Sequence, residues 1–309
     1  MSDANRIIAC SLALLPASAT AQLVAVDRTN QEVVELDTRT GQGVVLGPIP
    51  PKEDPYDLTY HAPGSQFIGV ATDWKDMQLF GIDAATWEFT VIRNYPGFDW
   101  IWLAIEYYPP GDTLYAIRAN VATHDTDLYV IDPATGDFTW VGDLPFYKVG
   151  GMAYDPVSGL MYVTAGIHYP SMLELHTINV ETGESVFIGE LHGAELSTSL
   201  AIVCHPTAGL LCIDSGQSKE SEDYLYVVDR ATAFVTLVGP TGQPTIVGMA
   251  FRPSCAADVN GDGALDILDF IAFQQLWQAA DPTADCDDSA QFNVLDYVCF
   301  QQLFVAGCS

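Results

Sequence analysis

The sequence LYVIDPATGDFTWVG, from Leu128 to Gly142, has a pattern that four other segments repeat. Alternating apolar residues lead to an Asp, a short turn follows that often ends in Thr-Gly, and a second alternating run leaves the turn. Alternation with a period of two on both sides of a turn predicts an antiparallel hairpin. The similar segments begin at Val33, Gln78, Glu174 and Leu225.

The hairpins recur at a nearly constant interval. The residues that open the turns are Asp37, Asp83, Asp132, Asn179 and Asp229, at successive spacings of 46, 49, 47 and 50 residues. Between the hairpins lies a second repeated unit, in which one strand enters a turn containing Pro and another leaves it. These units begin at Leu58, Ile105, Met152 and Ala201. Four strands in about 48 residues is the spacing of a β-propeller blade.

The two ends of the repeat are incomplete in complementary ways. Only one strand, QLVAVD from Gln22, precedes the first hairpin, and a lone strand, TIVGMAFRP from Thr245, follows the last. Pairing these ends completes a fifth blade and leaves no open sheet edge. The sequence therefore predicts an all-β, five-bladed propeller over residues 22–254, closed into a ring by its C-terminal strand.

Composition limits the classes of partner. The chain has 309 residues, of which 49% are apolar, enough for a large buried core. Its 40 acidic and 11 basic side chains give a formal charge of −29, which argues against nucleic acid or an anionic membrane surface as partner. Calcium, neutral sugars and other proteins are compatible with such a surface.

Residues 1–21 have the pattern of an export signal. Arg6 precedes the apolar run Ile7–Leu15, and Ala19–Ala21 forms an A-x-A cleavage pattern before Gln22. The apolar run is too short to span a bilayer, and no later segment has the length and apolarity of a membrane span. We therefore expect an exported protein, located in the extracellular space, at the cell surface or in the periplasm.

The innermost strands offer few groups for catalysis. The positions expected nearest the propeller axis are Asp57, Ala104, Gly151, Ala201 and Gly248, four of them small. Glycoside hydrolases need at least two placed carboxylates, and here only Asp57 and Glu106 approach such positions. The histidines lack metal-ligand spacing, and no G-x-S-x-G, H-E-x-x-H or P-loop motif occurs.

Three functions of the propeller stay open. The residues favour a non-catalytic propeller that binds a protein or a glycan. A carbohydrate-active enzyme is the alternative, and a structural spacer without a small ligand is the third. The aromatic segment Phe98–Pro110, with Trp100, Trp102, Tyr107 and Tyr108, either fills space between blades or stacks on a sugar or peptide.

Near the C-terminus the chain reads DVNGDGALDILD, from Asp258 to Asp269. Oxygen-bearing side chains occupy positions 1, 3, 5, 9 and 12 of this segment, Gly263 allows the sharp turn at position 6, and a backbone carbonyl serves position 7. This is the spacing of an EF-hand calcium loop. The predicted ligands are Asp258, Asn260, Asp262, Ala264, Asp266 and Asp269.

A second copy of the loop and of the segment after it follows 27 residues later. DILDFIAFQQLW from Asp266 aligns with NVLDYVCFQQLF from Asn293. Ala290 replaces the Gly of position 6, so a second calcium site is expected to be weaker. Its predicted ligands are Asp285, Asp287, Ser289, Gln291, Asn293 and Asp296.

Two calcium loops, each followed by a helix, within residues 255–309 resemble a dockerin domain. The terminal FVAGCS is similar to the dockerin-like anchors of exported bacterial proteins that end in Gly-Cys. The resemblance implies two antiparallel loop-helix units that are ordered by Ca²⁺ and dock onto a cohesin-like or other surface receptor.

The family's recognition positions map onto residues that differ from the usual ones. Where dockerins often carry Ser-Thr and basic residues, this chain has apolar pairs and Gln pairs, and its module contains no Lys, Arg or His. We therefore expect a receptor with different surface chemistry. In the alternative, Leu268 and Leu295 belong to the core and only the Gln pairs are exposed. The candidate partner-binding residues are Ile267, Leu268, Gln274, Gln275, Val294, Leu295, Gln301 and Gln302.

Six cysteines follow the export signal, an even number that favours disulfides in an oxidising compartment. Cys286 and Cys299 both occur in only one of the two repeats, which pairs them with each other. The dockerin resemblance implies a clasp between Cys255 and Cys308 at the ends of the module. Cys204 and Cys212 form either a cross-strand bridge or two buried thiols.

Overall fold

The computed structural model describes most of the chain beyond the predicted export signal. It covers residues 22–306 except 52, 74, 98, 168–173, 195, 197–199, 206–208, 215–221, 253–256, 258, 260–266, 280, 282–283, 287–288 and 290. Only the backbone is described for Leu200, Cys212, Asp214 and Ala306. The described residues form two compact units, one of strands and one of helices. Each unit is described by itself below.

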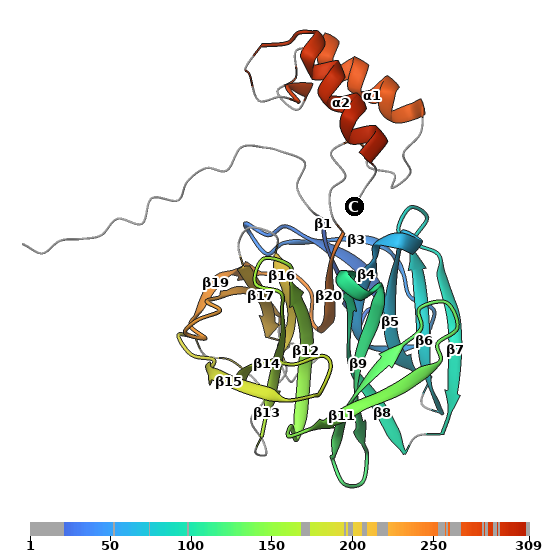
Figure 1. Cartoon of the computed structure of the whole chain (residues 1–309), viewed down its shortest axis with the longest axis vertical. Coiled ribbons are helices and arrows are strands. Elements are labelled where there is room, and N and C mark those ends of the chain that lie inside the picture. Colours follow the sequence, from blue (N-terminus) through green and yellow to red (C-terminus); the bar gives the residue numbers. More distant parts are fainter. Residues whose placement is uncertain are drawn as a thin grey trace, which may run out of the picture. The chain divides into compact units, whose positions relative to one another are not determined.

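The strands form five four-stranded antiparallel sheets arranged in a ring (Figure 1), so the predicted five-bladed propeller is confirmed. In each blade the strands are named from the innermost to the outermost. Blade 1 contains β20 (Ile246–Arg252), β1 (Gln22–Asp27), β2 (Glu32–Leu36) and β3 (Gly43–Pro48). Blade 2 contains β4 (Asp54–His61), β5 (Gln66–Thr72), β6 (Asp76–Asp83) and β7 (Phe89–Pro96).

 Blade 3 contains β8 (Trp100–Tyr108), β9 (Thr113–Asn120), β10 (Thr126–Ile131) and β11 (Phe138–Leu144). Blade 4 contains β12 (Lys148–Asp155), β13 (Leu160–Gly166), β14 (Glu174–Ile178) and β15 (Ser185–Glu190). Blade 5 contains β16 (Leu200–His205), β17 (Gly209–Asp214), β18 (Tyr224–Val228) and β19 (Val235–Pro240).

The ring closes as the sequence predicts. The C-terminal strand β20 pairs antiparallel with β1, with Phe251 opposite Leu23, and becomes the innermost strand of blade 1. Each innermost strand also contacts the innermost strand of the next blade, in the cycle β20, β4, β8, β12, β16 and back to β20. The apolar faces of neighbouring blades are buried against one another, which is where the core of the propeller lies.

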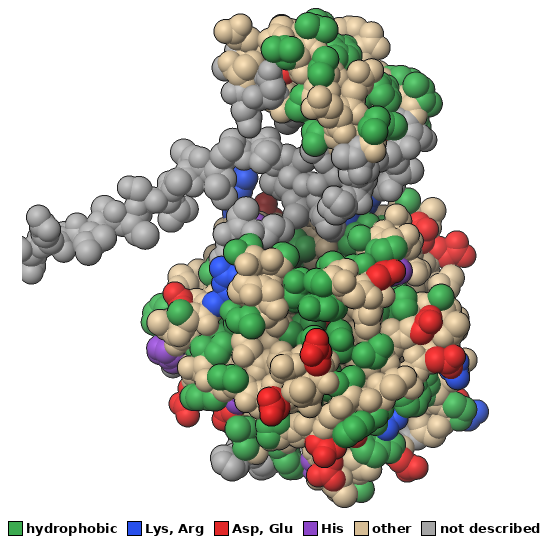
Figure 2. Space-filling view, in the orientation of Figure 1, with side chains coloured by type: hydrophobic (Ala, Val, Ile, Leu, Met, Phe, Trp, Pro, Cys, Tyr) green, Lys and Arg blue, Asp and Glu red, His purple; other side chains and the backbone are tan. Residues whose placement is uncertain are grey.

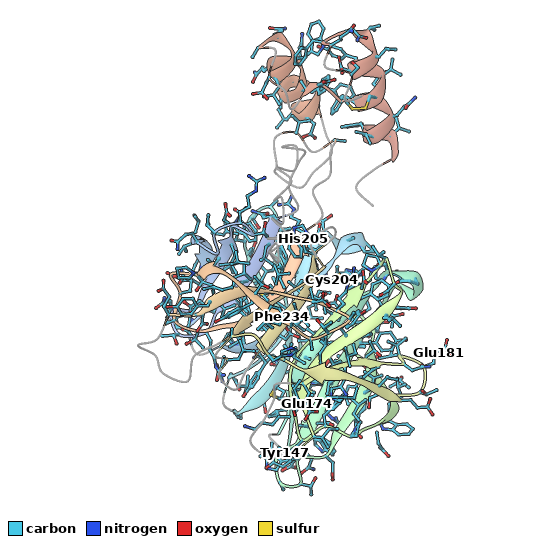
Figure 3. The ribbon with its side chains drawn as sticks, turned by 90° about the vertical axis from the view of Figure 1, so that its left-hand side faces the viewer. Tyr147, Glu174, Glu181, Cys204, His205 and Phe234 are labelled. Atoms are coloured by element: carbon cyan, nitrogen blue, oxygen red, sulfur yellow. A yellow bond between two sulfur atoms is a disulfide. The ribbon has the colours of Figure 1, made fainter. Side chains whose placement is uncertain are left out.

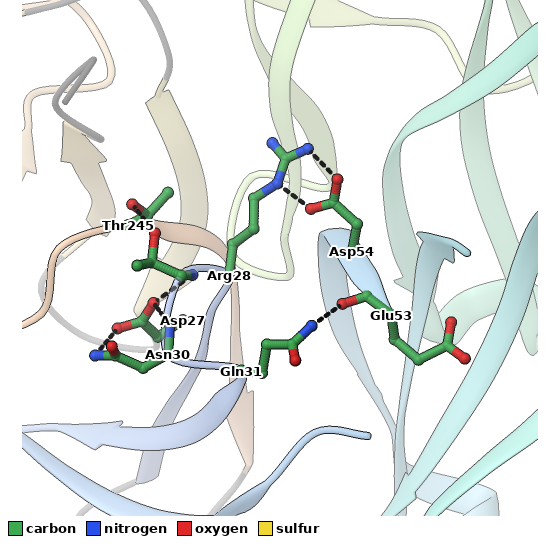
Figure 4. A network of polar contacts seen from close by, with 8 residues as sticks. Asp27, Arg28, Asn30, Gln31, Glu53, Asp54 and Thr245 are labelled. Carbon is green, nitrogen blue, oxygen red and sulfur yellow. Dashed lines mark hydrogen bonds and ion pairs between the residues drawn. The ribbon is translucent and has the colours of Figure 1, made fainter. Parts of the chain in front are cut away.

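Polar contacts around the β1–β2 turn reinforce this closure (Figure 4). The backbone N–H of Arg28 donates to the carbonyl of Thr245 at 2.9 Å, and the hydroxyls of Thr29 and Thr245 lie 2.8 Å apart. The Arg28 guanidinium forms an ion pair with Asp54 of β4 and lies over the ring of Tyr56, 5.0 Å from its centroid. The turn therefore holds β20 within blade 1 and blade 1 against blade 2.

Small residues on the innermost strands are required by the closeness of the next blade. A Cβ atom on Gly248 would lie 2.6 Å from Cα of Asp57, and one on Gly151 would lie 2.9 Å from the backbone N of Ile202. Ala104 and Ala201 are buried. Small side chains at these positions therefore let the innermost strands of neighbouring blades lie close together.

The repeated turns share one hydrogen-bonding pattern. In the turn after β10, the carboxylate of Asp132 accepts the backbone N–H groups of Ala134 and Thr135, and Gly136 adopts the left-handed conformation with φ +71°. Trp87 and Ala233 take the corresponding place in their turns with φ 59° each, although neither is Gly. Short 3-10 helices close two of the other turns, η1 (Ala62–Gly64) and η2 (Pro109–Gly111).

The helical unit contains α1 (Ile267–Gln278) and α2 (Val294–Ala306). Its core is aromatic: the rings of Phe273 and Phe300 stack with centroids 4.3 Å apart. Cys286 and Cys299 form a disulfide with Cα atoms 5.8 Å apart, as predicted. Cys255 and Cys308, the other predicted pair, lie outside the described residues. Within the described part of the chain, no helix has the length and apolarity needed to cross a bilayer.

Candidate functional site

Helix α2 begins at a pair of hydrogen bonds made by two of the predicted calcium ligands, Asn293 and Asp296. Asn293 Oδ1 accepts the backbone N–H of Leu295 at 2.8 Å, while Asp296 Oδ2 accepts the backbone N–H of Asn293 at 2.7 Å. This reciprocal arrangement is a capping box, which fixes the start of a helix. Upstream, Asp285 Oδ1 accepts the backbone N–H of Ser289 at 3.1 Å. Hydrogen bonds within the second loop thus join Asp285 to Ser289 and Asn293 to Asp296.

The donor chemistry of the two loops fits a calcium ion. Carboxylate, amide, hydroxyl and backbone oxygens are the ligands Ca²⁺ prefers. Asp269 and Asp296, the last predicted ligand of each loop, have no exposed surface, yet residues 255–309 contain no Lys, Arg or His. Burying a carboxylate is costly unless hydrogen bonds or a cation compensate it. Backbone N–H groups stabilise the charge of the Asp296 carboxylate in part, and a bound cation would stabilise it further.

Only part of the predicted ligand set can be placed. Of the first loop, Asp269 is described, whereas Asp258, Asn260, Asp262, Ala264 and Asp266 lie outside the described residues. Of the second loop, Asp287 lies outside them. Among the residues that the structure does describe, no three His, Cys, Asp or Glu side chains gather closely enough to hold a metal ion.

The candidate partner-binding residues lie on the surface of the helical unit. The apolar residues at the start of α1 and their counterparts in α2 are between 42% and 70% exposed. They are Ile267, Leu268 and Ile271 in α1, and Val294, Leu295 and Val298 in α2. Figure 2 shows apolar side chains on the surface of this unit. Leu268 and Leu295 are thus not core residues, and the alternative that only the Gln pairs are exposed is wrong.

Both helices are apolar on two faces. Phe270 and Phe273 of α1 pack inward against Phe300 of α2, while Ile267, Leu268 and Ile271 remain exposed. The Gln pairs, Gln274 with Gln275 and Gln301 with Gln302, are exposed on the next turns of the helices. A helix of a globular protein usually buries its single apolar face and presents a polar one. The second apolar face here is an uncovered surface, which we call the helix patch: Ile267, Leu268, Ile271, Val294, Leu295 and Val298.

In the propeller, the candidate catalytic carboxylates join neighbouring blades. Asp57 on β4 is fully buried, and its carboxylate accepts the backbone N–H groups of Leu58, at 2.9 Å, and of Ile105 on β8, at 3.0 Å. Burial raises the pKa of Asp57 well above its ordinary value, and the nearby Glu106 raises it further. The side chain acts as a link between blades 2 and 3.

Glu106 makes the corresponding link between blades 3 and 4. Its Oε1 accepts the backbone N–H of Tyr154 on β12 at 3.0 Å, and its Oε2 accepts the hydroxyl of Thr59 at 2.9 Å. The residue keeps some exposed surface, but its carboxylate is enclosed, and this burial raises the pKa of Glu106 to about 8. Asp57 therefore joins blades 2 and 3, whereas Glu106 contacts both blade 2, through Thr59, and blade 4, through Tyr154.

Cys204 is a free thiol at the end of β16, next to His205 (Figure 3). Its Sγ lies 3.6 Å from Oδ1 of Asp155, whose carboxylate also pairs with Arg230. Burial and the adjacent Asp155 raise the pKa of the Cys204 thiol to about 12. A thiol with such a pKa is a poor nucleophile at neutral pH, so this cysteine is a structural residue.

The aromatic segment places one tryptophan in the core and one in the lining of a pocket. Trp102 is buried and meets Tyr95, Tyr129 and Phe138 at ring distances of 5.5 to 5.7 Å. Trp100, two residues earlier, lines an open pocket together with Arg118. The sequence analysis did not find Arg118. Its signal is a single basic residue inside the apolar strand TLYAIRAN, in a chain with few basic residues.

Comparisons with known proteins support the fold. No protein-family model and no curated protein matches this sequence. A chain in the crystal structure of a nidogen/laminin complex is similar, with a TM-score of 0.52 and 11% identity over 76% of this chain and 99% of that chain. That likeness is to the fold alone.

Other similar structures differ in what they do. TolB from Acinetobacter baumannii has a TM-score of 0.45 and 11% identity, over 76% of this chain and 67% of its own. An engineered GH43 glycoside hydrolase has a TM-score of 0.48 and 10% identity, over 62% of this chain and 42% of its own. These two likenesses are weaker than the first, and no function follows from them.

Proposed function

We propose that this chain is an exported, non-catalytic binding propeller that is attached to a cell-surface or extracellular assembly by its calcium-dependent, dockerin-like helical unit. The propeller carries the ligand-binding role, and the helical unit docks onto a cohesin-like or other surface receptor protein. The observation that carries the proposal is the helix patch, an apolar surface repeated in α1 and α2.

The repetition of the patch supports a docking role. Each exposed apolar residue of α1 has an exposed apolar counterpart 27 residues later: Ile267 with Val294, Leu268 with Leu295 and Ile271 with Val298. Exposed apolar surface on a small unit is costly in water, and clusters of it mark interaction sites. Because basic residues are absent from the unit, the receptor is recognised by apolar contact and by amide hydrogen bonds from the Gln pairs.

In this proposal, calcium is a folding cofactor of the helical unit. The predicted ligands stand directly before and at the start of α1 and α2, so an ion bound to them would fix where both helices begin. Without it, the buried Asp269 and Asp296 would lose part of the electrostatic compensation for their charge. Removing calcium should therefore disorder the unit and dismantle the helix patch.

The enzymatic alternative lacks the constellation it needs. An acid and a base or nucleophile must face one substrate cavity. Asp57 and Glu106 instead accept hydrogen bonds from backbone N–H groups of the following blades, and Glu106 also accepts one from Thr59. The positions of these carboxylates therefore favour a binding propeller over an enzyme.

A pulldown from the host's exported proteins tests the proposal. The full chain, immobilised in Ca²⁺, should capture a receptor that is then identified by mass spectrometry and produced separately. Its affinity for the wild type should fall by at least tenfold on addition of EDTA and in the Leu268→Asp/Leu295→Asp double variant. Val157→Asp is the matched control, because Val157 is an exposed aliphatic residue of the propeller, 75% accessible.

Two results would contradict the proposal. If the receptor is still captured in the presence of EDTA, docking does not depend on calcium. If the purified receptor binds the wild type and the double variant with equal affinity, the helix patch is not the docking surface. Separately, calorimetric titration of the chelator-treated full chain with Ca²⁺ should show one or two sites, and the absence of binding would refute the loop assignment.

A further inference from the structure

A pocket of about 350 Å³ opens between blades 2 and 3 of the propeller. The end of β7 supplies Arg93 and Asn94, and the connection to β8 supplies Asp99. The first two strands of blade 3 supply Trp100, on β8, and Arg118, on β9. All of these elements belong to the propeller, so the site does not involve the helical unit. A volume of this size lies at the lower end of the range for small-molecule sites.

Arg118 is held in a cage of aromatic rings. Its guanidinium carbon lies 4.3 Å from the centroid of Trp100 and 4.4 Å from that of Tyr129, with Phe138 at 5.3 Å and Trp102 at 5.5 Å. Its Nη2 donates to the hydroxyl of Tyr129 at 2.6 Å. Cation–π contacts on this scale restrict the guanidinium to one orientation before any ligand arrives.

Arg118 has no direct ion pair within the described part of the propeller, although its cross-strand neighbour Asp127 accepts from the same Tyr129 hydroxyl at 3.4 Å. No carboxylate of the described residues lies within ion-pair distance of it, and its Nε is buried without a hydrogen-bond partner. By contrast, the neighbouring Arg93 pairs with Asp137 at 2.6 Å. In a chain with a formal charge of −29, a fixed guanidinium that lines a pocket without a direct carboxylate partner favours an anionic ligand. Guanidinium groups bind carboxylates well because their donors match the carboxylate geometry.

The rest of the lining favours a sugar as the carrier of that anion. Trp100 is half-buried, so part of its ring is available for stacking. Exposed amide and carboxylate groups of Asn94 and Asp99 stand at the rim, where they can hydrogen-bond hydroxyl groups. Asn94 Oδ1 accepts from Gln78 Nε2 at 3.0 Å, which fixes the amide and leaves its NH₂ as a donor.

We infer that this pocket binds a sugar residue that carries a carboxylate, a uronic acid, with the carboxylate on Arg118 and the ring against Trp100. The inference rests on the proposed binding role of the propeller and makes that role specific. It does not depend on docking of the helical unit. A failure here would therefore leave the receptor pulldown unaffected, and the reverse holds as well.

The test is a titration of the full chain with sodium D-glucuronate, followed by calorimetry and by tryptophan fluorescence. Glucuronate should bind saturably, and D-glucose, which lacks the carboxylate, should bind at least tenfold more weakly. Arg118→Met should weaken glucuronate at least tenfold and should leave the weak affinity for glucose nearly unchanged. Equal affinity for the two sugars, or no saturable binding of glucuronate, would overturn the inference.

A second variant keeps the test decisive if Arg118→Met does not fold. Asp99 is an exposed carboxylate that lines the pocket and would repel the carboxylate of glucuronate. Asp99→Asn should therefore raise the affinity for glucuronate about twofold to threefold. The affinity for glucose, which has no charge, should not change. Glu88→Gln, an exposed charge removal at the other end of β7, is the control and should change neither. An unchanged affinity in Asp99→Asn contradicts the placement of the carboxylate. Tighter binding of acetyl-Gly-Gly than of glucuronate would assign the pocket to a peptide carboxylate instead.

Discussion

The carboxylate of Asp57 accepts the backbone N–H of Ile105 at 3.0 Å, across the boundary between blades 2 and 3. The innermost strand β8 pairs with β9 on one side only, so the N–H groups on its other edge have no partner within the sheet. Two of them, on Ile105 and Tyr107, donate instead to Asp57 and Thr59 of the preceding blade. Side chains thus satisfy an inner edge that a propeller otherwise leaves open.

Asp57→Ala should therefore destabilise the propeller. Two buried backbone donors, on Leu58 and Ile105, lose their acceptor, and each unsatisfied donor costs about 1–3 kcal/mol. We expect the free energy of unfolding to fall by about 3 kcal/mol in urea denaturation. Asp76→Ala, which removes an acceptor of one exposed N–H, is the control and should cost less than about 1 kcal/mol. Equal effects of the two substitutions would contradict the structural role of Asp57.

Glu106 should make the stability of the propeller depend on pH. The pKa of Glu106 is about 8 in the folded chain and 4.5 as its ordinary value, so the folded state binds the proton more tightly than the unfolded state. Stability is then fully present below pH 4.5 and is progressively lost as the pH rises through 8. We expect a loss of about 5 kcal/mol across this range from this residue.

The measurement is the free energy of unfolding from urea denaturation at several pH values between 5 and 9. In Glu106→Gln the side chain has no proton to lose, so the slope should flatten, while the variant keeps an acceptor for the N–H of Tyr154. Glu88→Gln, at an exposed site, should keep the slope of the wild type. An identical slope in wild type and Glu106→Gln would show that other groups set the pH dependence.

The ring of blades could be predicted from sequence because its determinants are local. Period-two alternation and an Asp that accepts the N–H groups two and three residues later specify each hairpin, as at Asp132. The incomplete first and last units then leave one way to close the ring. Neither argument needs knowledge of which side chains meet across blades.

The sites could be predicted less well, because they depend on contacts between distant residues. The cage around Arg118 combines rings from β8, β10 and β11, and no motif of one segment records it. Exposure of Leu268 and Leu295 was equally open, since an apolar pattern on both faces of a helix does not tell which face is buried. The blade-linking role of Glu106 depends on the register between neighbouring blades.

The left-handed turn positions allow a test of backbone strain. Gly159 has φ +71° and no atom within 4 Å of the place where a Cβ would lie, so Gly159→Ala should cost only the strain of that conformation, about 1 kcal/mol. Gly41→Ala adds a contact of 2.7 Å with the carbonyl oxygen of Gly239 and should cost more. Ala233→Gly relieves strain at φ 59° and should be neutral or slightly stabilising. Thermal melts give the change in stability of each of the three variants. If Gly159→Ala destabilises the chain as much as Gly41→Ala does, the added contact with Gly239 has no cost, which would contradict the prediction.

The contact between Arg28 and Asp54 should contribute to ring closure. Arg28→Ala removes the ion pair and the cation–π contact with Tyr56, and it leaves the buried Asp54 without its partner. We expect a loss of about 2 kcal/mol in the free energy of unfolding. Arg39→Ala, an exposed arginine of the same blade, is the control and should lie within about 0.5 kcal/mol of the wild type. A double-mutant cycle with Asp54→Asn isolates the pair, and a coupling energy near zero would contradict its role.

The helix patch should be dispensable for stability although it is apolar. Leu268 and Leu295 are at least half exposed, so replacing both with Gln should change the stability of the helical unit by less than about 1 kcal/mol. Phe273→Ala is the contrast, because Phe273 is buried and stacks on Phe300, and its loss should cost about 3–5 kcal/mol. Circular dichroism at 222 nm follows α1 and α2, and melts in Ca²⁺ give the comparison. A large loss of stability in the double Gln variant would mean that both leucines are covered within the chain itself. An unchanged melt combined with lost receptor binding would separate docking from folding, which is the distinction that the exposure of these residues predicts.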